Sequence, residues 1–248
     1  MPADPWSDLA DDWDRSWGTF ARPVWAPLLD AAGIGPGTRV LDVGCGTGAL
    51  LAHLRDQGAR PSGVDPAARM AELAQARAPG VDVRRGEFED LPFDDAAFDA
   101  VLAVNAFQLA DPDEALAEAA RVLAPGGVLG LAGWAERARN DLDALDTALA
   151  VADGEEPPED GPLRVAGGLA GALADARWEV LDVGLTTVPW TAAHDDDLVS
   201  GVLLGEDPAT VADLAPVVLA AAAPYRRADG SYLFRNAFRW AVGRAPAG

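Results

Sequence analysis

The stretch that decides the fold is Val40-Leu41-Asp42-Val43-Gly44-Cys45-Gly46-Thr47-Gly48. Its first part, residues 39–43, is rich in apolar and β-branched side chains and holds no turn residue, which predicts a strand. Glycines then occupy alternate positions, and glycine accepts a positive φ and lets a ligand approach the backbone. Thr47 is expected to cap a helix over residues 49–57, whose unpaired amides would face a ligand. The stretch therefore predicts a cofactor-binding turn between a strand and a helix.

Two classes of adenosine cofactor fit such a turn. The run Gly44-Cys45-Gly46-Thr47-Gly48-Ala49 satisfies the dinucleotide fingerprint G-x-G-x-x-G/A, which would indicate an NAD-dependent oxidoreductase. A dinucleotide would place its pyrophosphate on this turn, where the carboxylate of Asp42 would repel it. S-adenosylmethionine has no phosphate, and its ammonium and sulfonium groups both favour a nearby carboxylate. A tight turn without any ligand would need only one glycine.

Length and charge narrow the class of protein. A chain of 248 residues, half of them hydrophobic, fits one α/β domain with elaborations. The 40 acidic and 19 basic residues, all of the latter arginine, give a net charge of −21, which argues against nucleic acid or an anionic membrane as partner. We expect no apolar run of membrane-spanning length and no signal region, hence a cytoplasmic location. Cys45, the single cysteine, is expected to be a small filler between glycines rather than a nucleophile.

Strands and helices alternate along most of the chain. The pattern predicts strands over residues 60–64, 81–85, 98–104 and 128–132, with helices over 67–78 and 113–123. This alternation is typical of a doubly wound, mostly parallel sheet. Further on, a helix is expected over 169–176, a strand over 178–188, mostly helix over 195–223 and a last strand over 231–242, antiparallel to its neighbours. Residues 141–160 hold eight acidic side chains and no basic one, which predicts a solvated helix and loop.

The glycine turn resembles the first motif of the class I S-adenosylmethionine-dependent methyltransferases, in which an acidic residue precedes three alternating glycines. Further motifs of that family follow in order: Asp65 at the end of the second strand, Gly86–Phe93 after the third and Val104–Gln108 after the fourth. The structural turn Arg121–Gly127 matches the family's R-V-L-x-P-G-G. The resemblance covers residues 38–132.

The resemblance implies S-adenosylmethionine as the cofactor and assigns a role to each motif. Asp65 would accept hydrogen bonds from the ribose hydroxyls, Glu87 would meet the adenine amino group, and the stretch from Asn105 to Gln108 would border the reacting methyl. The cofactor-binding residues implied are Asp42, Gly44, Cys45, Gly46, Gly48, Asp65, Pro66, Glu87, Phe88, Asn105 and Gln108.

The family's fold is a Rossmann-like sheet of seven strands with a late antiparallel strand, here with helical lid segments at the N- and C-terminal sides. We expect one such domain over 1–248, composed of a helical lid (1–32), a cofactor-binding core (38–134) and an acceptor-side elaboration with the last strands (135–248). On a helix Trp13 and Trp17 would share a face, as a lid over the site requires.

Candidate acceptor contacts lie mainly outside the family motifs. Aromatic side chains suit a flat, partly apolar molecule, and either Arg164 or Arg226 would suit a carboxylate on it. The candidates are Trp13, Trp17, Trp134, Arg164, Trp190, Tyr225 and Arg226. His194 is the candidate catalytic base, and His53 is expected to be structural. No His or Cys spacing indicates a metal site.

Together these features predict methyl transfer from S-adenosylmethionine to a small molecule, a class that includes secondary metabolites, by in-line displacement. The alternative is a protein of this fold that catalyses a cyclisation or rearrangement, or only binds the cofactor. A monomer or homodimer with no nucleic-acid or membrane partner is expected. The acceptor and the methylated atom, O, N, S or C, stay open.

Overall fold

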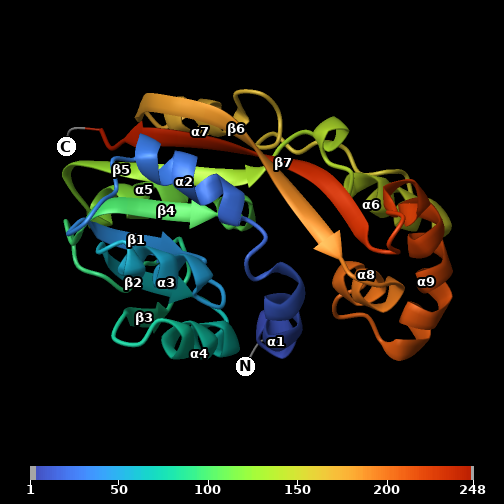
Figure 1. Ribbon diagram of the computed structural model, residues 1–248. Coiled ribbons are helices and arrows are strands. Elements are labelled where there is room, and N and C mark those ends of the chain that lie inside the picture. The colour runs from blue at the N-terminus through green and yellow to red at the C-terminus, as the bar shows by residue number, and fades with distance from the viewer. Residues whose placement is uncertain (1–3, 247–248) are drawn as a thin grey trace.

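The computed structural model describes residues 4–246 and is built on one seven-stranded sheet (Figure 1). The strand order is β3-β2-β1-β4-β5-β7-β6. The first five strands pair in parallel, and β7 pairs antiparallel with both β5 and β6. The predicted fold is thereby confirmed. The strands are β1 (Arg39–Val43), β2 (Arg60–Asp65), β3 (Asp82–Arg85), β4 (Phe98–Val104), β5 (Leu123–Trp134), β6 (Glu179–Ala192) and β7 (Tyr232–Arg244).

The chain reverses its direction of travel across the sheet between β1 and β4. Val40 of β1 pairs with Pro61 of β2 on one side and with Ala100 of β4 on the other. The loops that leave β1 and β4 therefore depart to opposite sides and open a crevice at the carboxyl ends of the strands. In open α/β sheets this switch point is where ligands bind.

Helices cover both faces of the sheet. One face packs under α2 (Arg22–Ala31) and α3 (Ala49–Asp56), and the other under α5 (Pro112–Val122) and α7 (Gly168–Asp175). Along the β3 side, α4 (Ala68–Arg77) packs on α3 through Ala71 and Ala74. Cys45 lies buried in this cluster, in agreement with its expected role as a filler.

The long strands β6 and β7 carry a second group of helices away from the sheet (Figure 1). This helical lobe consists of α6 (Asp143–Ala152), α8 (Asp195–Val202) and α9 (Pro208–Ala222), whose apolar side chains pack around Phe234 and Tyr232 at the far end of β7. The region expected to be mostly helical, 195–223, is two helices joined by the loop 203–207. The N-terminal helix α1 (Pro5–Trp17) contacts both α4 and α8.

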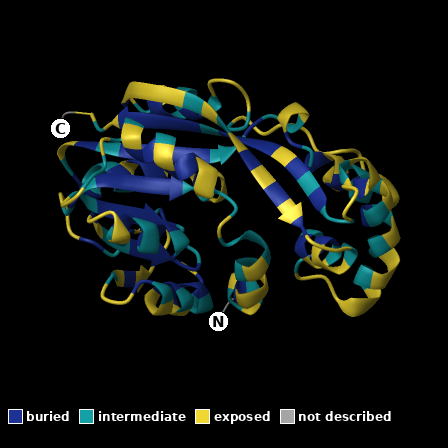
Figure 2. Cartoon of the chain, in the orientation of Figure 1, coloured by how far each residue is buried: buried dark blue, intermediate teal, exposed yellow. Residues whose placement is uncertain are grey.

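The expectation that no apolar run reaches membrane-spanning length was wrong. Pro208–Tyr225, which covers α9 and the short helix after it, has 18 residues and a mean hydropathy of 1.2. By length and composition alone it is long and apolar enough to cross a membrane. In the structure Val218 and Ala222 are buried in the helical lobe, while much of the remaining α9 surface is exposed or half-buried (Figure 2).

Two local expectations are also corrected. Gly48, not Thr47, is the N-cap of α3, because the backbone there is left-handed at φ +81° and the Thr47 hydroxyl bonds elsewhere. The acidic segment 141–160 is not all solvated, because Asp143 is buried in ion pairs with Arg137 and Arg164.

Gly48→Ala is expected to destabilise the fold by about 2–4 kcal/mol. A left-handed Ala costs roughly 1 kcal/mol, and the added Cβ would lie 2.7 Å from the Cα of Ala74 in α4, an overpacking that costs about 1–3 kcal/mol. Gly80→Ala is the matched control, since φ is +86° there and nothing lies within 4 Å of the new Cβ. Urea unfolding of both variants measures the difference; equal losses would contradict the close packing of α3 on α4.

Candidate functional site

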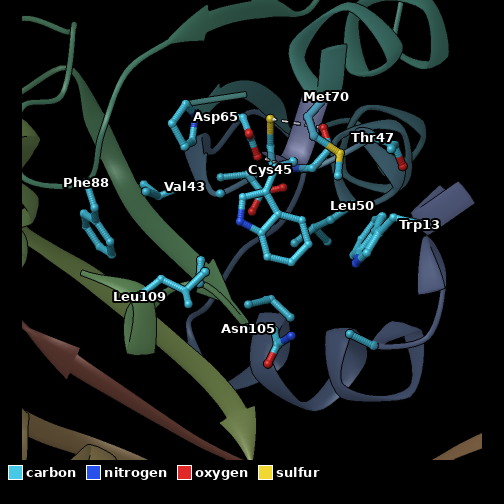
Figure 3. A pocket seen from close by; sticks show the side chains of 18 of the residues that line it. Trp13, Val43, Cys45, Thr47, Leu50, Asp65, Met70, Phe88, Asn105 and Leu109 are labelled. Carbon is cyan, nitrogen blue, oxygen red and sulfur yellow. Dashed lines mark hydrogen bonds between the residues drawn. The ribbon is translucent and has the colours of Figure 1, made fainter. Parts of the chain in front are cut away.

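A cavity of about 460 Å³ opens at the predicted switch point, between the glycine turn, α1 and the ends of β3 and β4 (Figure 3). Its size suits a small-molecule ligand. The turn that borders it is held from below by β2. The N–H groups of Gly44 and Cys45 donate to the carbonyl of Val64 at 2.9 and 3.0 Å. A Cβ on Gly44 would lie 2.5 Å from the Cβ of Ala106 after β4, so only glycine lets these two loops approach.

Asp65 holds the turn in shape and still faces the cavity. Its Oδ2 accepts from the N–H of Gly46 at 2.9 Å and its Oδ1 from the N–H of Ala67 at 3.0 Å. Each carboxylate oxygen keeps acceptor capacity for a ligand hydroxyl. Burial raises the pKa of Asp65, against the lowering effect of these two backbone bonds.

Asp42 is the second buried carboxylate of the site. It is the last but one residue of β1, with 3% of its surface exposed, and no described residue donates a hydrogen bond to its side chain. Burial, followed by the charge of Asp65, raises the pKa of Asp42 to about 8. A buried carboxylate without a partner is a natural place for a ligand cation.

The ends of β3 and β4 supply the opposite border. Phe88, buried to 6% exposure, lies edge-on to Phe107 and faces the cavity. Asn105 follows β4 with φ +58°, a strained value that Asn tolerates better than most residues. Its Oδ1 and backbone carbonyl both accept from the Gln108 amide, at 3.1 and 2.9 Å. The two amides are therefore fixed relative to each other beside the turn.

Aromatic side chains form the wall that faces the glycine turn. Trp17 stacks on Trp190 with ring centres 4.8 Å apart, and its indole N–H donates to the carbonyl of Gly201 in α8. Phe20 is held edge-on to Trp17 and packs against Trp134. The indole N–H of Trp17 is thus committed to the helical lobe rather than to a ligand. The wall consists of Trp6, Trp13, Trp17, Phe20, Trp25 and Trp134.

Helix α1 closes this wall over the turn and is attached by polar bonds. The carboxylate of Asp4 and the hydroxyl of Ser7 accept from the N–H groups of Ala68 and Arg69, the first two residues of α4. The N-cap residue of α1 and a residue of its first turn thereby cap a different helix. One turn from its end, α1 is bound again.

The second attachment of α1 joins it to the glycine turn itself. Arg77 at the end of α4 donates to both carboxylate oxygens of Asp14, at 2.8 and 2.6 Å, and to the hydroxyl of Thr47 at 2.7 Å. Thr47 in turn donates to Asp14. Sequence reasoning missed this three-residue bridge, because Asp14 lies 33 positions from Thr47 and 63 from Arg77, and neither Asp14 nor Arg77 belongs to a motif.

The structure brings most of the predicted cofactor residues to one cavity. All of them line it except Gly48, which lies beneath the turn against α4. Of the predicted acceptor residues, Trp13, Trp17 and Trp134 line the same cavity. Trp6, Phe20, Trp25, Leu109 and Leu204 line it as well, although none of them is among the predicted site residues.

Besides Gly48, five predicted residues lie outside the cavity lining, namely four acceptor candidates and the candidate base. Arg164 pairs with Asp143, and Trp190 lies behind Trp17 with its N–H bound to Ser16. Tyr225 packs on Phe234 in the helical lobe. His194 is the N-cap of α8 and borders a separate surface depression together with Arg226, which pairs with Asp195. Among the described residues, no group of three or more His, Cys, Asp or Glu side chains is placed to hold a metal ion.

The chain is similar in sequence to known methyltransferases over the part that contains the glycine turn. Residues 41–131 match the family described as "Methyltransferase domain". An uncharacterized methyltransferase of Mycobacterium tuberculosis is 42% identical over 115 residues, 44% of this chain and 46% of that protein. A malonyl-acyl carrier protein O-methyltransferase of Serratia marcescens is 33% identical over 154 residues, 62% of this chain and 59% of that protein. The chain thus spans about half the length of the curated relatives it matches.

Solved structures share the fold over most of the chain. A putative methyltransferase of Bacillus halodurans superposes with a TM-score of 0.62, at 19% identity, over 90% of this chain and 98% of its own. The cyclase SpnF superposes with a TM-score of 0.60, at 23% identity, over 94% of this chain and 83% of its own. The family match identifies a class I S-adenosylmethionine-dependent methyltransferase domain over residues 41–131, and the solved structures show that the rest of the chain shares their fold.

Proposed function

We propose that the chain binds S-adenosylmethionine in the cavity and transfers its methyl group to a small molecule held against the aromatic wall. The observation that carries the proposal is the buried, unpartnered carboxylate of Asp42 beside the glycine turn. A phosphate-bearing cofactor would be repelled there, whereas a ligand ammonium would be stabilised. When bound, the cofactor supplies the electrophilic methyl and the leaving group.

The residues present fit this cofactor. Asp65 is oriented by two backbone N–H groups and can accept from a pair of ribose hydroxyls. Phe88 and Glu87 border the place for an adenine ring, and Asn105 with Gln108 would lie beside the methionine portion. The protein's part in the reaction is positioning and exclusion of water, which the locked aromatic wall and α1 provide. We propose that α1, within residues 1–32, acts as a lid.

We further propose a single domain over 1–248, with the core at 38–134 and residues 135–248 on the acceptor side. The acceptor would be a small molecule, with secondary metabolites among the candidates. The protein would act in the cytoplasm as a monomer or homodimer and would bind neither nucleic acid nor a membrane. Support for this comes from the net charge of −21, which disfavours polyanions and anionic surfaces. His194 borders a separate depression and does not line the cavity. Its role as the base is therefore proposed from the sequence alone.

A second candidate function is a cyclisation or rearrangement without methyl loss. It is favoured by the fold likeness to the cyclase SpnF and by the lack of a histidine in the described cavity lining. Mass spectrometry of products from an acceptor library separates the two. We expect products heavier by one methyl together with S-adenosylhomocysteine. Isomers formed with the cofactor intact would favour the second function instead.

Asp65→Asn is expected to weaken S-adenosylmethionine binding at least tenfold. The substitution removes the negative charge from the side chain that we propose accepts hydrogen bonds from both ribose hydroxyls, and a hydrogen bond to a charged group contributes about 1.5–3 kcal/mol. Titration calorimetry measures the affinity. Asp56→Asn is the matched control, because Asp56 is an exposed carboxylate at the far end of α3. Absence of binding in the wild type would contradict the cofactor proposal, and wild-type affinity in Asp65→Asn would contradict the role of Asp65.

The free energy of unfolding of the cofactor-free protein is expected to fall as pH rises from about 4 to 8. The pKa of Asp42 is about 8 in the folded chain and about 3.9 in an unfolded one. Between these two pH values the folded state keeps a proton on Asp42 that the unfolded state releases. The contribution of protonated Asp42 to the free energy of unfolding is therefore full below pH 4 and lost as pH rises through 8. Urea unfolding at several pH values between 5 and 8.5 should show a shallower dependence in Asp42→Asn. Parallel curves for the two proteins would refute a protonated Asp42.

A further inference from the structure

The charge of the cavity lining is one-sided. Four carboxylates line it, those of Asp42, Asp65, Glu87 and Glu89, and the described lining contains no arginine or histidine. The sequence has no lysine to add. S-adenosylmethionine brings two cationic groups and one carboxylate, so the lining stays acidic when the cofactor is counted. Burial raises the pKa values of both Asp42 and Asp65, and neighbouring carboxylates add to the effect, Asp65 for Asp42 and Asp4 with Glu87 for Asp65.

The arginines nearest the site are already engaged elsewhere. Arg77 pairs with Asp14 behind the turn at 2.6 Å. Arg85 donates to the backbone carbonyl of Pro66 at 3.0 Å from the outer side. Arg164, the residue expected to meet an acceptor carboxylate, is paired with the buried Asp143. An anionic acceptor would thus lose its hydration in this cavity without gaining a partner, which costs several kcal/mol.

The opposite wall favours cations and flat apolar surfaces. Tryptophan presents the best ring face for a cation, and the four wall residues other than Trp17 and Phe20 are all tryptophans. Trp17 and Phe20 are fixed by their stacking on Trp190 and packing on Trp134, so the wall is formed before an acceptor arrives. Such preorganisation lowers the cost of binding a rigid ring.

The lining also lacks a strong base. Asp42 keeps its proton near neutral pH, Asp65 is bound by two backbone N–H groups, and Glu89 accepts from the N–H of Asp111 at 2.7 Å. An ordinary carboxylate is too weak a base to ionise an alcohol or phenol near neutral pH. A carboxylate acceptor needs no base but meets no cation. An amine needs no cation from the protein, and because its ammonium form can release a proton to water, its nitrogen lone pair becomes available without a strong base in the lining.

We propose that the acceptor of this site is an apolar amine and that its nitrogen receives the methyl group. This rests on the proposed methyl transfer. The ammonium held by the acidic lining first releases a proton to water, and the nitrogen lone pair thus freed forms the new bond to the methyl carbon while the carbon–sulfur bond breaks and its electron pair stays on sulfur, leaving S-adenosylhomocysteine. Positive charge passes from sulfur to nitrogen, and a primary or secondary amine then gives a proton to water. The acidic and aromatic lining stabilises positive charge throughout.

Matched probes test the charge preference independently of turnover. Tryptamine, tryptophol and indole-3-propionate share a ring and differ in an amine, a hydroxyl and a carboxylate; phenethylamine, 2-phenylethanol and 3-phenylpropionate form a second set with a smaller ring. Calorimetry on the protein saturated with S-adenosylhomocysteine is expected to show at least tenfold tighter binding of the amine than of the acid in one set or both. Equal or tighter binding of the acids, or no amine binding at millimolar concentration, would overturn the proposal.

A variant pair assigns the preference to the cavity rather than to the overall acidity. Glu89→Gln keeps an oxygen for the Asp111 N–H and removes the charge, and is expected to reduce the amine-to-acid ratio severalfold. Glu156→Gln makes the same change on an exposed loop and should leave the ratio unchanged. An unaltered ratio in Glu89→Gln would overturn the part given to Glu89. With S-adenosylmethionine added, methyl esters or ethers in place of methylamines would overturn the nitrogen assignment, whereas failure to bind S-adenosylhomocysteine at all would contradict the proposed function itself.

Discussion

The site depends on two carboxylates that are buried next to each other at the carboxyl ends of β1 and β2. Asp42 and Asp65 have 3% and 7% of their surface exposed, and the part of the chain that the structure describes offers neither an arginine partner. A globular protein normally pairs or neutralises a buried charge. Here burial raises the pKa of Asp42 to about 8, so it holds a proton near neutral pH, and Asp65 accepts from backbone N–H groups that shape the glycine turn. The fold thus keeps two carboxyl groups where the proposed cofactor brings positive charge, and a cation beside Asp42 favours loss of its proton.

Helix α1 covers one side of this charged crevice. Two of its attachments are polar: its start caps α4 through Asp4 and Ser7, and Asp14 joins Arg77 and Thr47. The third is aromatic, because Trp17 at its end stacks on Trp190 and donates to the carbonyl of Gly201. The polar attachments can open at a smaller cost than a core contact, while Trp17 keeps the end of the helix in place. That property suits a lid, because a ligand between α1 and the sheet must enter past it.

The sequence allowed the fold and the cofactor side to be predicted because both depend on local patterns. Alternating glycines after a strand dictate a turn wherever they occur, and Asp65 and Asn105 follow strands whose ends a parallel sheet must bring together. The same reasoning failed for Thr47, since its hydroxyl is taken by Asp14, 33 positions earlier. It failed also for Arg164, whose partner Asp143 lies in a segment that reads as solvated. Contacts between distant elements that belong to no repeated pattern leave no trace in composition or spacing.

The cofactor half of the site could be predicted from the sequence, whereas the aromatic half could not. The cofactor half lies on the parallel strands, where each residue's neighbour follows from strand order. The aromatic half is assembled from α1, the loop before α2 and the end of β5, and its rigidity comes from Trp190 on β6 and Gly201 in α8. These two residues touch no ligand space themselves but hold Trp17 by its ring face and by its N–H. The long antiparallel pair β6 and β7 therefore does more than extend the sheet. It carries the helical lobe to α1 and so positions the aromatic wall against which we propose that the acceptor binds.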